Sequence, residues 1–181
     1  MHREKIVELR ADKFVTIVDE SKLTDKLGPS FPLPVEVTPF CYKSTLRSVA
    51  ALPACKGCEP RMRLGSAANI KVDGDELAVT DNGNYIIDLY FKEPIADVLA
   101  AAQQIKATIG VVDHGLFCSM AAEAIVAGKG GVYVLHPESP ARVGSRVDLE
   151  VLSARLAGAG ETAAAPPEPM KRGKKRANDG A

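Results

Sequence analysis

Apolar positions near the start of the chain change from the spacing of a helix to the spacing of a strand. Residues 3–11, REKIVELRA, place their apolar side chains at intervals that favour an α-helix. Residues 14–18, FVTIV, form a short β-branched run, which the polar residues 19–21 follow. A buried strand with polar residues at its carboxyl end is typical of a parallel α/β sheet, whose ligands bind beyond the strand ends. Lys22 lies at that edge of the predicted sheet.

A second pattern begins after the break at Gly28-Pro29 and has the order strand, helix, strand, strand, helix, strand. A tight turn is predicted before the third strand, at residues 81–84, because Asn-Gly tolerates the positive φ that such a turn requires. The βαββαβ order is that of ferredoxin-like domains, which have a four-stranded antiparallel sheet with two helices on one face. The predicted strands are residues 33–40, 60–65, 84–91 and 110–117, and the predicted helices are residues 42–52 and 94–107.

The chain then returns to β-rich sequence in residues 122–128 and 131–136, which we expect to rejoin the first sheet. The predicted fold class is α/β (α+β), a remnant of a Rossmann-like parallel sheet with an inserted ferredoxin-like βαββαβ lobe. We assign the domains as follows: residues 1–28 and 120–150 to the Rossmann-like catalytic lobe, 29–119 to the ferredoxin-like lobe and 151–181 to a disordered tail.

The tail prediction rests on composition, because residues 152–181 are dominated by Ala, Gly, Pro and charged residues that cannot bury enough apolar surface to fold. Its basic run KRGKKR, residues 171–176, could direct the protein to a nucleus or contact a polyanion. A solvated tail is the interpretation that we favour.

Composition and charge narrow the class of protein. The 181 residues carry 23 basic and 23 acidic side chains, and a net charge of zero argues against a general nucleic-acid binder. No apolar run approaches the ~20 residues that cross a bilayer, and the first residues lack the apolar centre of a signal peptide. We therefore expect an intracellular, cytoplasmic protein that does not bind membranes, with four free cysteines.

The pair Cys55 and Cys58 forms a C-x-x-C motif, which can be half of a zinc site or a redox pair. A structural zinc site needs four ligands, and no second pair stands at ligand spacing. The other candidate ligands are isolated along the chain: Cys41, Cys118, His2, His114 and His136. We therefore predict a surface loop here and no metal site.

Five stretches together resemble ribose-5-phosphate isomerase of the type A family, in its plant and algal branch. They are REKIVE, DESKL, LGPSFPLPVEVTPF, VTDNGNYIIDLYFKEPI and GVVDHGLF, and the resemblance runs from about residue 2 to residue 135. It implies an enzyme of the pentose phosphate pathway and the Calvin cycle that interconverts ribose 5-phosphate and ribulose 5-phosphate. The reaction is an aldose-ketose isomerisation through an enediolate, without metal or organic cofactor.

The same resemblance implies roles for single residues. It carries the catalytic general base onto Glu4 and a substrate-holding lysine onto Lys22, with Arg3 as a further substrate-binding residue. A desolvated carboxylate suits proton removal from a carbon next to a carbonyl, and an ammonium group suits a phosphate. Without the resemblance, Glu4 would be interpreted as a first-turn residue favoured by the helix dipole. The expected partners are a small-molecule sugar phosphate and further copies of the chain, bound through the ferredoxin-like lobe.

The sequence also departs from the family. Members carry a Gly-Thr-Gly-Ser-Thr phosphate loop, an Asp-Gly-Ala-Asp-Glu segment and a Lys-Gly-Gly-Gly segment, and none of these occurs here. We therefore expect an incomplete chain, whose own turnover the sequence leaves open, and a plastid location as the alternative to the cytoplasm.

Two other classes of function remain open. One is an inactive fragment that acts as an oligomerisation or binding module. The other is a nucleic-acid module, because βαββαβ is also the order of RNA-recognition domains, but their aromatic motifs are absent from GVVDHGLF and NYIIDLYF. His114 is interpreted as a turn or subunit-contact residue rather than as a catalytic one.

Overall fold

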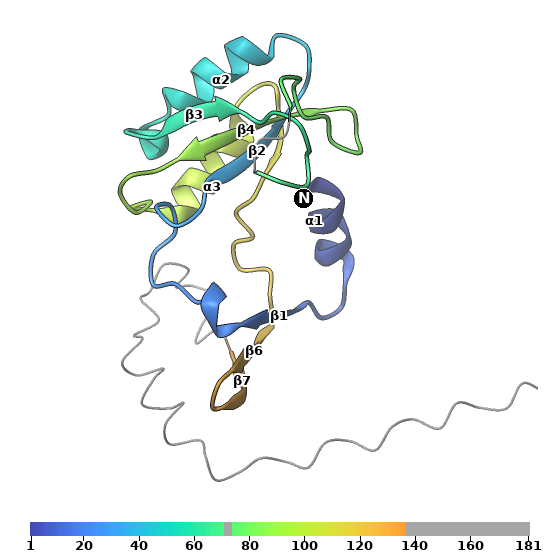
Figure 1. Ribbon diagram of the computed structural model, residues 1–181, viewed down its shortest axis with the longest axis vertical. Helices are drawn as coiled ribbons and strands as arrows, with labels where there is room; N and C mark the ends of the chain where they lie inside the picture. Colours follow the sequence, from blue (N-terminus) through green and yellow to red (C-terminus); the bar gives the residue numbers. More distant parts are fainter. Residues whose placement is uncertain (71–73, 137–181) are drawn as a thin grey trace, which may run out of the picture.

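The computed structural model describes residues 1–70 and 74–136, and the predicted tail lies outside these residues. Two separate sheets organise this part of the chain, one in the upper and one in the lower half of the view in Figure 1. The elements in chain order are α1 (His2–Arg10), β1 (Val15–Asp19), the 3-10 turn η1 (Glu20–Lys22), β2 (Leu33–Val37), α2 (Tyr42–Ala50), the 3-10 turn η2 (Pro53–Cys55), β3 (Glu59–Met62), β4 (Tyr85–Tyr90), α3 (Val98–Ala107), β5 (Val111–His114), β6 (Glu123–Gly128) and β7 (Gly131–Leu135).

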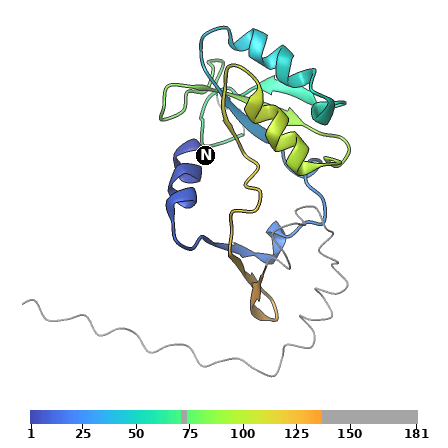
Figure 2. The same ribbon diagram turned by 180° about the vertical axis from the view of Figure 1, so that it is seen from behind.

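The larger sheet has the strand order β3-β4-β2-β5, with every neighbouring pair antiparallel. Helices α2 and α3 lie on the same face of it, as Figure 2 shows from behind. The predicted βαββαβ lobe is therefore confirmed, and residues 33–37 and 111–114 share one sheet as expected. We call this unit, β2 to β5 with its two helices, the four-stranded lobe.

The core of the four-stranded lobe lies between the sheet and the two helices. Alternate residues of the central strands, among them Val35, Ile87 and Leu89, are fully buried and meet Ala101 and Ile105 of α3. This face of the sheet is thus dry and apolar. The pleat sends the intervening residues to the opposite face, which carries the polar side chains described below.

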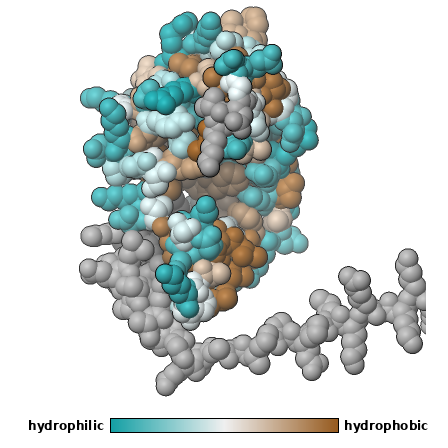
Figure 3. Space-filling model, viewed as in Figure 1, coloured by the Kyte–Doolittle hydropathy of each residue, from teal (hydrophilic) through white to brown (hydrophobic). Residues whose placement is uncertain are grey.

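The smaller sheet has the order β1-β6-β7, in which β1 and β6 are parallel and β6 and β7 form an antiparallel hairpin. The pairing of β1 with β6 confirms that the chain rejoins its first sheet after the inserted lobe. Hydrophobic side chains gather on the surface over β1 (Figure 3). Three of the residues exposed in this sheet are Ile17, Val132 and Val134.

Several predicted boundaries differ from the observed ones for local reasons. Helix α3 begins at Val98 rather than at residue 94, because the Asp97 side chain accepts a hydrogen bond from the Ala100 N–H and caps the helix there. The predicted turn before β4 is confirmed, and Gly83 has a φ of +74°. The prediction of a surface loop was wrong for Cys55, which is fully buried against the core of the four-stranded lobe.

Candidate functional site

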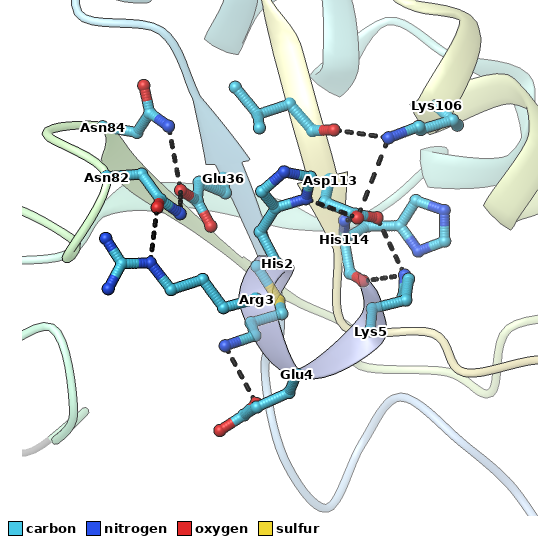
Figure 4. A network of polar contacts seen from close by, with 12 residues as sticks. His2, Arg3, Glu4, Lys5, Glu36, Asn82, Asn84, Lys106, Asp113 and His114 are labelled. Carbon is cyan, nitrogen blue, oxygen red and sulfur yellow. Dashed lines mark hydrogen bonds and ion pairs between the residues drawn. The ribbon is translucent and has the colours of Figure 1, made fainter. Parts of the chain in front are cut away.

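Glu4 lies in the first turn of α1, where the helix dipole favours an acidic side chain. Its carboxylate is 70% exposed and is 2.9 Å from the amino group of Met1. Figure 4 shows the side chain pointing away from the polar network that surrounds the other residues of this turn. The carboxylate is therefore solvated and ion-paired within the described residues, and it is not desolvated as a general base is expected to be.

The neighbours of Glu4 are held by the four-stranded lobe. Lys5 is buried, and its Nζ donates to Asp113 Oδ1 at 2.8 Å and to the backbone carbonyl of His114. His2 Nδ1 lies 3.0 Å from the other carboxylate oxygen of Asp113 (Figure 4). These contacts fix the first turn of α1 on strand β5, and they orient Glu4 through the backbone rather than through its own side chain.

Arg3 adds a third attachment to the four-stranded lobe. Its Nε donates to Asn82 Oδ1 at 2.8 Å, and its Nη2 donates to the backbone carbonyl of Asp81 at 2.6 Å. Both acceptors belong to the tight turn before β4, so the turn predicted from the sequence also binds the first turn of α1. No carboxylate among the described residues pairs with this guanidinium, so its charge is not neutralised there.

Asp113 is the buried anion at the centre of this attachment. Burial alone would raise the pKa of its carboxyl group, but hydrogen bonds from Lys5 and His2 and from the His114 N–H outweigh that effect. The pKa of Asp113 is held well below its ordinary value, so the group is ionised under all ordinary conditions. A fourth group, Lys106 of α3, lies 3.8 Å from the carboxylate.

Glu36 is a second buried anion and is the cross-strand partner of Asp113. A single oxygen, Oε1, accepts hydrogen bonds from Thr80 Oγ1 at 2.9 Å, from Asn82 Nδ2 at 3.2 Å and from Asn84 Nδ2 at 2.9 Å. Burial favours the neutral form of Glu36, but these bonds outweigh it and lower its pKa. The polar face of the sheet therefore presents two adjacent carboxylates to the cationic first turn of α1.

Lys22 ends the 3-10 turn that follows β1, at the carboxyl end of the parallel pair β1 and β6. Asp19 caps this turn by accepting a hydrogen bond from the Ser21 N–H at 2.8 Å. Lys22 is exposed, and its ammonium group makes no hydrogen bond within residues 1–70 and 74–136. It is thus placed to meet an anion, although no contact between Lys22 and Glu4 is described.

Sequence reasoning predicted the exposed residues of this site but missed the buried ones. The roles of Glu4, Lys22 and Arg3 remain predictions, because the structure gives positions and contacts and holds no substrate. The buried network of His2, Lys5, Glu36 and Asp113 was not predicted. Its visible signal was an acidic residue at the middle of two apolar strands, PVEVT and VVDHG, which a buried strand tolerates only with partners.

His114 was expected at a turn or a subunit contact. It is buried at the end of β5, where its Nδ1 accepts a hydrogen bond from the Leu116 N–H. Burial, together with the charges of Lys5 and Lys106, lowers its pKa to about 4. The imidazole is therefore neutral at physiological pH and helps to close the chain after β5.

No group of three or more His, Cys, Asp or Glu side chains is arranged to hold a metal ion in the part of the chain that the structure describes. None of the helices within the same residues has the length and apolar character needed to span a bilayer.

Comparison with known proteins gives consistent matches. The model of the family "Ribose 5-phosphate isomerase A (phosphoriboisomerase A)" matches residues 1–131. A probable ribose-5-phosphate isomerase 3, chloroplastic, of Arabidopsis thaliana is 49% identical over 135 residues, covering 74% of this chain and 46% of the relative. Ribose-5-phosphate isomerase A of Synechococcus sp. is 44% identical over 134 residues, covering 74% of this chain and 53% of the relative.

Solved structures agree with these matches. The ribose 5-phosphate isomerase of Plasmodium falciparum superposes with a TM-score of 0.67 at 35% identity, covering 76% of this chain and 56% of that one. The enzyme of Methanocaldococcus jannaschii superposes with a TM-score of 0.64 at 38% identity, covering 75% and 55%. The chain spans about half the length of the curated relatives that it matches.

Proposed function

The chain belongs to the ribose 5-phosphate isomerase A family, and from this premise we propose that it interconverts ribose 5-phosphate and ribulose 5-phosphate. The observation that carries the proposal is the first turn of α1, which presents the Glu4 carboxylate while its other side chains are fixed to the four-stranded lobe. The comparisons do not support the alternative of an inactive binding module. The reaction belongs to the pentose phosphate pathway and the Calvin cycle, as the family implies.

Glu4 acts as the general base in this proposal. Its carboxylate removes the proton from C2 of the aldose, which leaves an enediolate. The hydroxyl proton of O2 passes to O1, and the carboxylic acid formed on Glu4 returns a proton to C1 to give the ketose. One group can serve both carbons because they are adjacent. Proton transfer of this kind depends on geometry, and the contacts of His2, Arg3 and Lys5 supply a fixed backbone for the base.

Lys22 binds the phosphate of the substrate in the same proposal. Its ammonium group, whose nearby charge also acts on Asp19, lies beyond the carboxyl end of a parallel strand, which is the usual ligand edge of an α/β sheet. Arg3 serves as a second, weaker cation, since the described residues leave its guanidinium charge without an anionic partner. The oxygens of a phosphate accept hydrogen bonds from either cation, from an ammonium group as a point charge and from a guanidinium group through its planar donors.

The remaining context of the enzyme follows the relatives. We propose a homo-oligomer that associates through the four-stranded lobe, and a location in either the cytoplasm or the plastid. The plastid is supported by the Arabidopsis thaliana relative whose name describes it as chloroplastic. The partner in either compartment is the sugar phosphate itself.

The test compares Glu4→Gln with Lys22→Ala in an isomerisation assay on ribose 5-phosphate. Because the chain spans about half of its relatives, the variants are made both in this chain and in a chimera. The chimera carries the part of the Arabidopsis relative that the match does not cover. Glu4→Gln should lower kcat at least ~100-fold with little change in KM, as expected for loss of a positioned general base. Lys22→Ala should mainly raise KM, because a phosphate cation acts on the ground and transition states alike.

Asp12→Asn is the matched control, since Asp12 is an exposed carboxylate that follows α1. It should leave both constants unchanged. Near-normal kcat in the Glu4→Gln chimera would reject Glu4 as the base. An unsubstituted chimera that is folded but has no activity on ribose 5-phosphate would reject the proposed reaction for this chain.

A further inference from the structure

The C-x-x-C motif lies in the connection between α2 and β3, in the four-stranded lobe and outside the proposed isomerase site. The turn η2 carries Cys55, whose N–H donates to the Leu52 carbonyl at 2.9 Å. The chain then folds back, and the Cys58 N–H donates to the Cys55 carbonyl at 3.0 Å. These backbone bonds close a single turn that carries both cysteines.

The two thiols occupy different environments. Cys55 is fully buried in the core, whereas Cys58 is only partly buried at its edge. The hydrogen bond with Cys58, together with burial, raises the pKa of the Cys55 thiol. The hydrogen bond from Cys55 stabilises the thiolate of Cys58 and lowers its pKa. Cys58 is therefore both the more accessible of the two thiols and the one that ionises more readily.

The chain contains two further cysteines that serve as internal comparisons. Cys41 is exposed at the amino end of α2, and Cys118 is partly buried after β5, where burial raises its pKa. The structure describes all four cysteines, and among them Cys55 and Cys58 share one hydrogen-bonded turn. Cys41 therefore serves as an exposed cysteine without a neighbouring cysteine, for comparison with the two cysteines of the C-x-x-C motif, which share one turn.

The surroundings leave room for a small reactant. A cavity of about 450 Å³ borders the motif, lined on one side by Lys56 and Gly57 and on the other by residues 91–97. Gly57 has a φ of +83°, and no atom lies within 4 Å of the position that a Cβ would take there. The cavity lies beside the Lys56-Gly57 turn and neither cysteine lines it, so a reactant reaches the motif through the partly exposed side chain of Cys58.

We propose that Cys55 and Cys58 form a reversible dithiol–disulfide site that exchanges with small-molecule disulfides such as oxidised glutathione. The Cys58 thiolate attacks one sulfur of the reactant, forming a mixed disulfide and releasing one glutathione thiolate. Cys55 then loses its proton to solvent and attacks Cys58 Sγ, which releases the second glutathione thiolate. Two electrons pass from the protein to the reactant, one protein disulfide forms, and two glutathione molecules are produced. The proposal is independent of the isomerase reaction.

The experiment equilibrates the native protein with increasing ratios of oxidised to reduced glutathione, followed by acid quenching, alkylation and tryptic mass spectrometry. Trypsin cleaves after Lys56, between the two cysteines, so the disulfide joins two otherwise separate peptides, residues 48–56 and 57–61. We expect this linked pair to rise with the share of oxidised glutathione and to disappear on reduction. Cys55→Ser should leave Cys58 as a stable mixed disulfide with glutathione, and Cys58→Ser should leave Cys55 unmodified in the native protein.

Cys41→Ser is the matched control and should keep the linked peptides. Absence of the linked pair at every ratio in the unsubstituted protein would overturn the proposal, and this measurement does not depend on any variant folding. Equimolar zinc that protects both thiols from alkylation, in a protein that forms no linked pair, would assign the motif to metal binding and would overturn it as well.

Discussion

The two sheets of this protein are built from similar strands but differ in what covers them. Ile87 in β4 of the four-stranded lobe is fully buried, whereas Ile17 in β1 is 74% exposed. Their ion pairs differ in the same way, since Arg63 and Asp88 pair in the interior of the lobe while Lys13 and Glu123 pair in contact with solvent. An apolar pattern therefore predicts a strand. How much that strand contributes to stability depends on whether helices pack on the sheet and bury its side chains.

The largest expected difference between the two sheets is in the free energy of unfolding, when the same Ile→Ala substitution is made in each. Ile87→Ala should lower the free energy of unfolding by about 2–5 kcal/mol, because it leaves a cavity in a closed core. Ile17→Ala should change it by less than about 0.5 kcal/mol, because the side chain is already in solvent. Urea denaturation followed by circular dichroism measures both. Equal losses would mean that the small sheet has a covered core of its own in solution.

A second test addresses the polar contacts between α1 and the four-stranded lobe. Asp113→Ala leaves the buried Lys5 ammonium without its anion, and we expect a loss of about 1–3 kcal/mol, because Lys5 can turn towards solvent when α1 separates from the lobe. The amide protons of α1 should exchange at least ~10-fold faster, while those of β4 keep their protection. Glu59→Ala, in an exposed pair with Arg61, is the control and should change neither. Unchanged exchange in α1 would show that other contacts hold the helix.

The smallest expected effect is a pH dependence confined to the four-stranded lobe. The pKa of His114 is about 4 in the folded protein against an ordinary value of 6.5, because burial and the nearby Lys5 and Lys106 disfavour its charged form. The unfolded chain therefore binds a proton between these values that the folded chain does not, and stability falls as the pH drops through that window. After allowance for solvent screening we expect a loss of about 1–2 kcal/mol.

The measurement is the free energy of unfolding between about pH 7 and about pH 4.5. His114→Gln should flatten the slope, whereas His136→Gln, which removes an exposed imidazole beyond β7, should leave it in place. The lowered pKa of Asp113 acts at a more acidic pH, because its contribution is lost only as the pH falls through its own folded value. A slope that persists in His114→Gln would assign the effect to another group.

The sequence predicted the order of the elements well because each one carries a local signal. Residues 81–84 contain the turn chemistry of an antiparallel connection, and the β-branched runs of β2 and β4 alternate with amphipathic helices. The candidate site residues named from the sequence are exposed and lie in recognisable words such as REKIVE and DESKL, and their roles remain predictions. Turn residues, apolar periodicity and family motifs can all be recognised without knowing which segments contact one another in the fold.

The buried part of the site could not be predicted, because it depends on contacts between residues far apart in the chain. Lys5 and Asp113 are 108 positions apart, and neither residue type indicates a buried partner by itself. Cys55 was placed in a surface loop for the same reason, since Pro, Lys and Gly surround it in sequence while core residues surround it in space. Long-range packing overrides local composition at such positions.

The arrangement of the first turn of α1 has a consequence for how the protein can evolve. His2, Arg3 and Lys5 bind the four-stranded lobe, whereas Glu4 faces solvent between them. Under the proposed function, mutations at His2 and Lys5 are exposed to selection through the amount of folded protein, those at Glu4 through the rate of the reaction, and those at Arg3 through both. On that proposal, a single helical turn carries two kinds of evolutionary constraint on neighbouring residues, one set by folding and one set by the reaction.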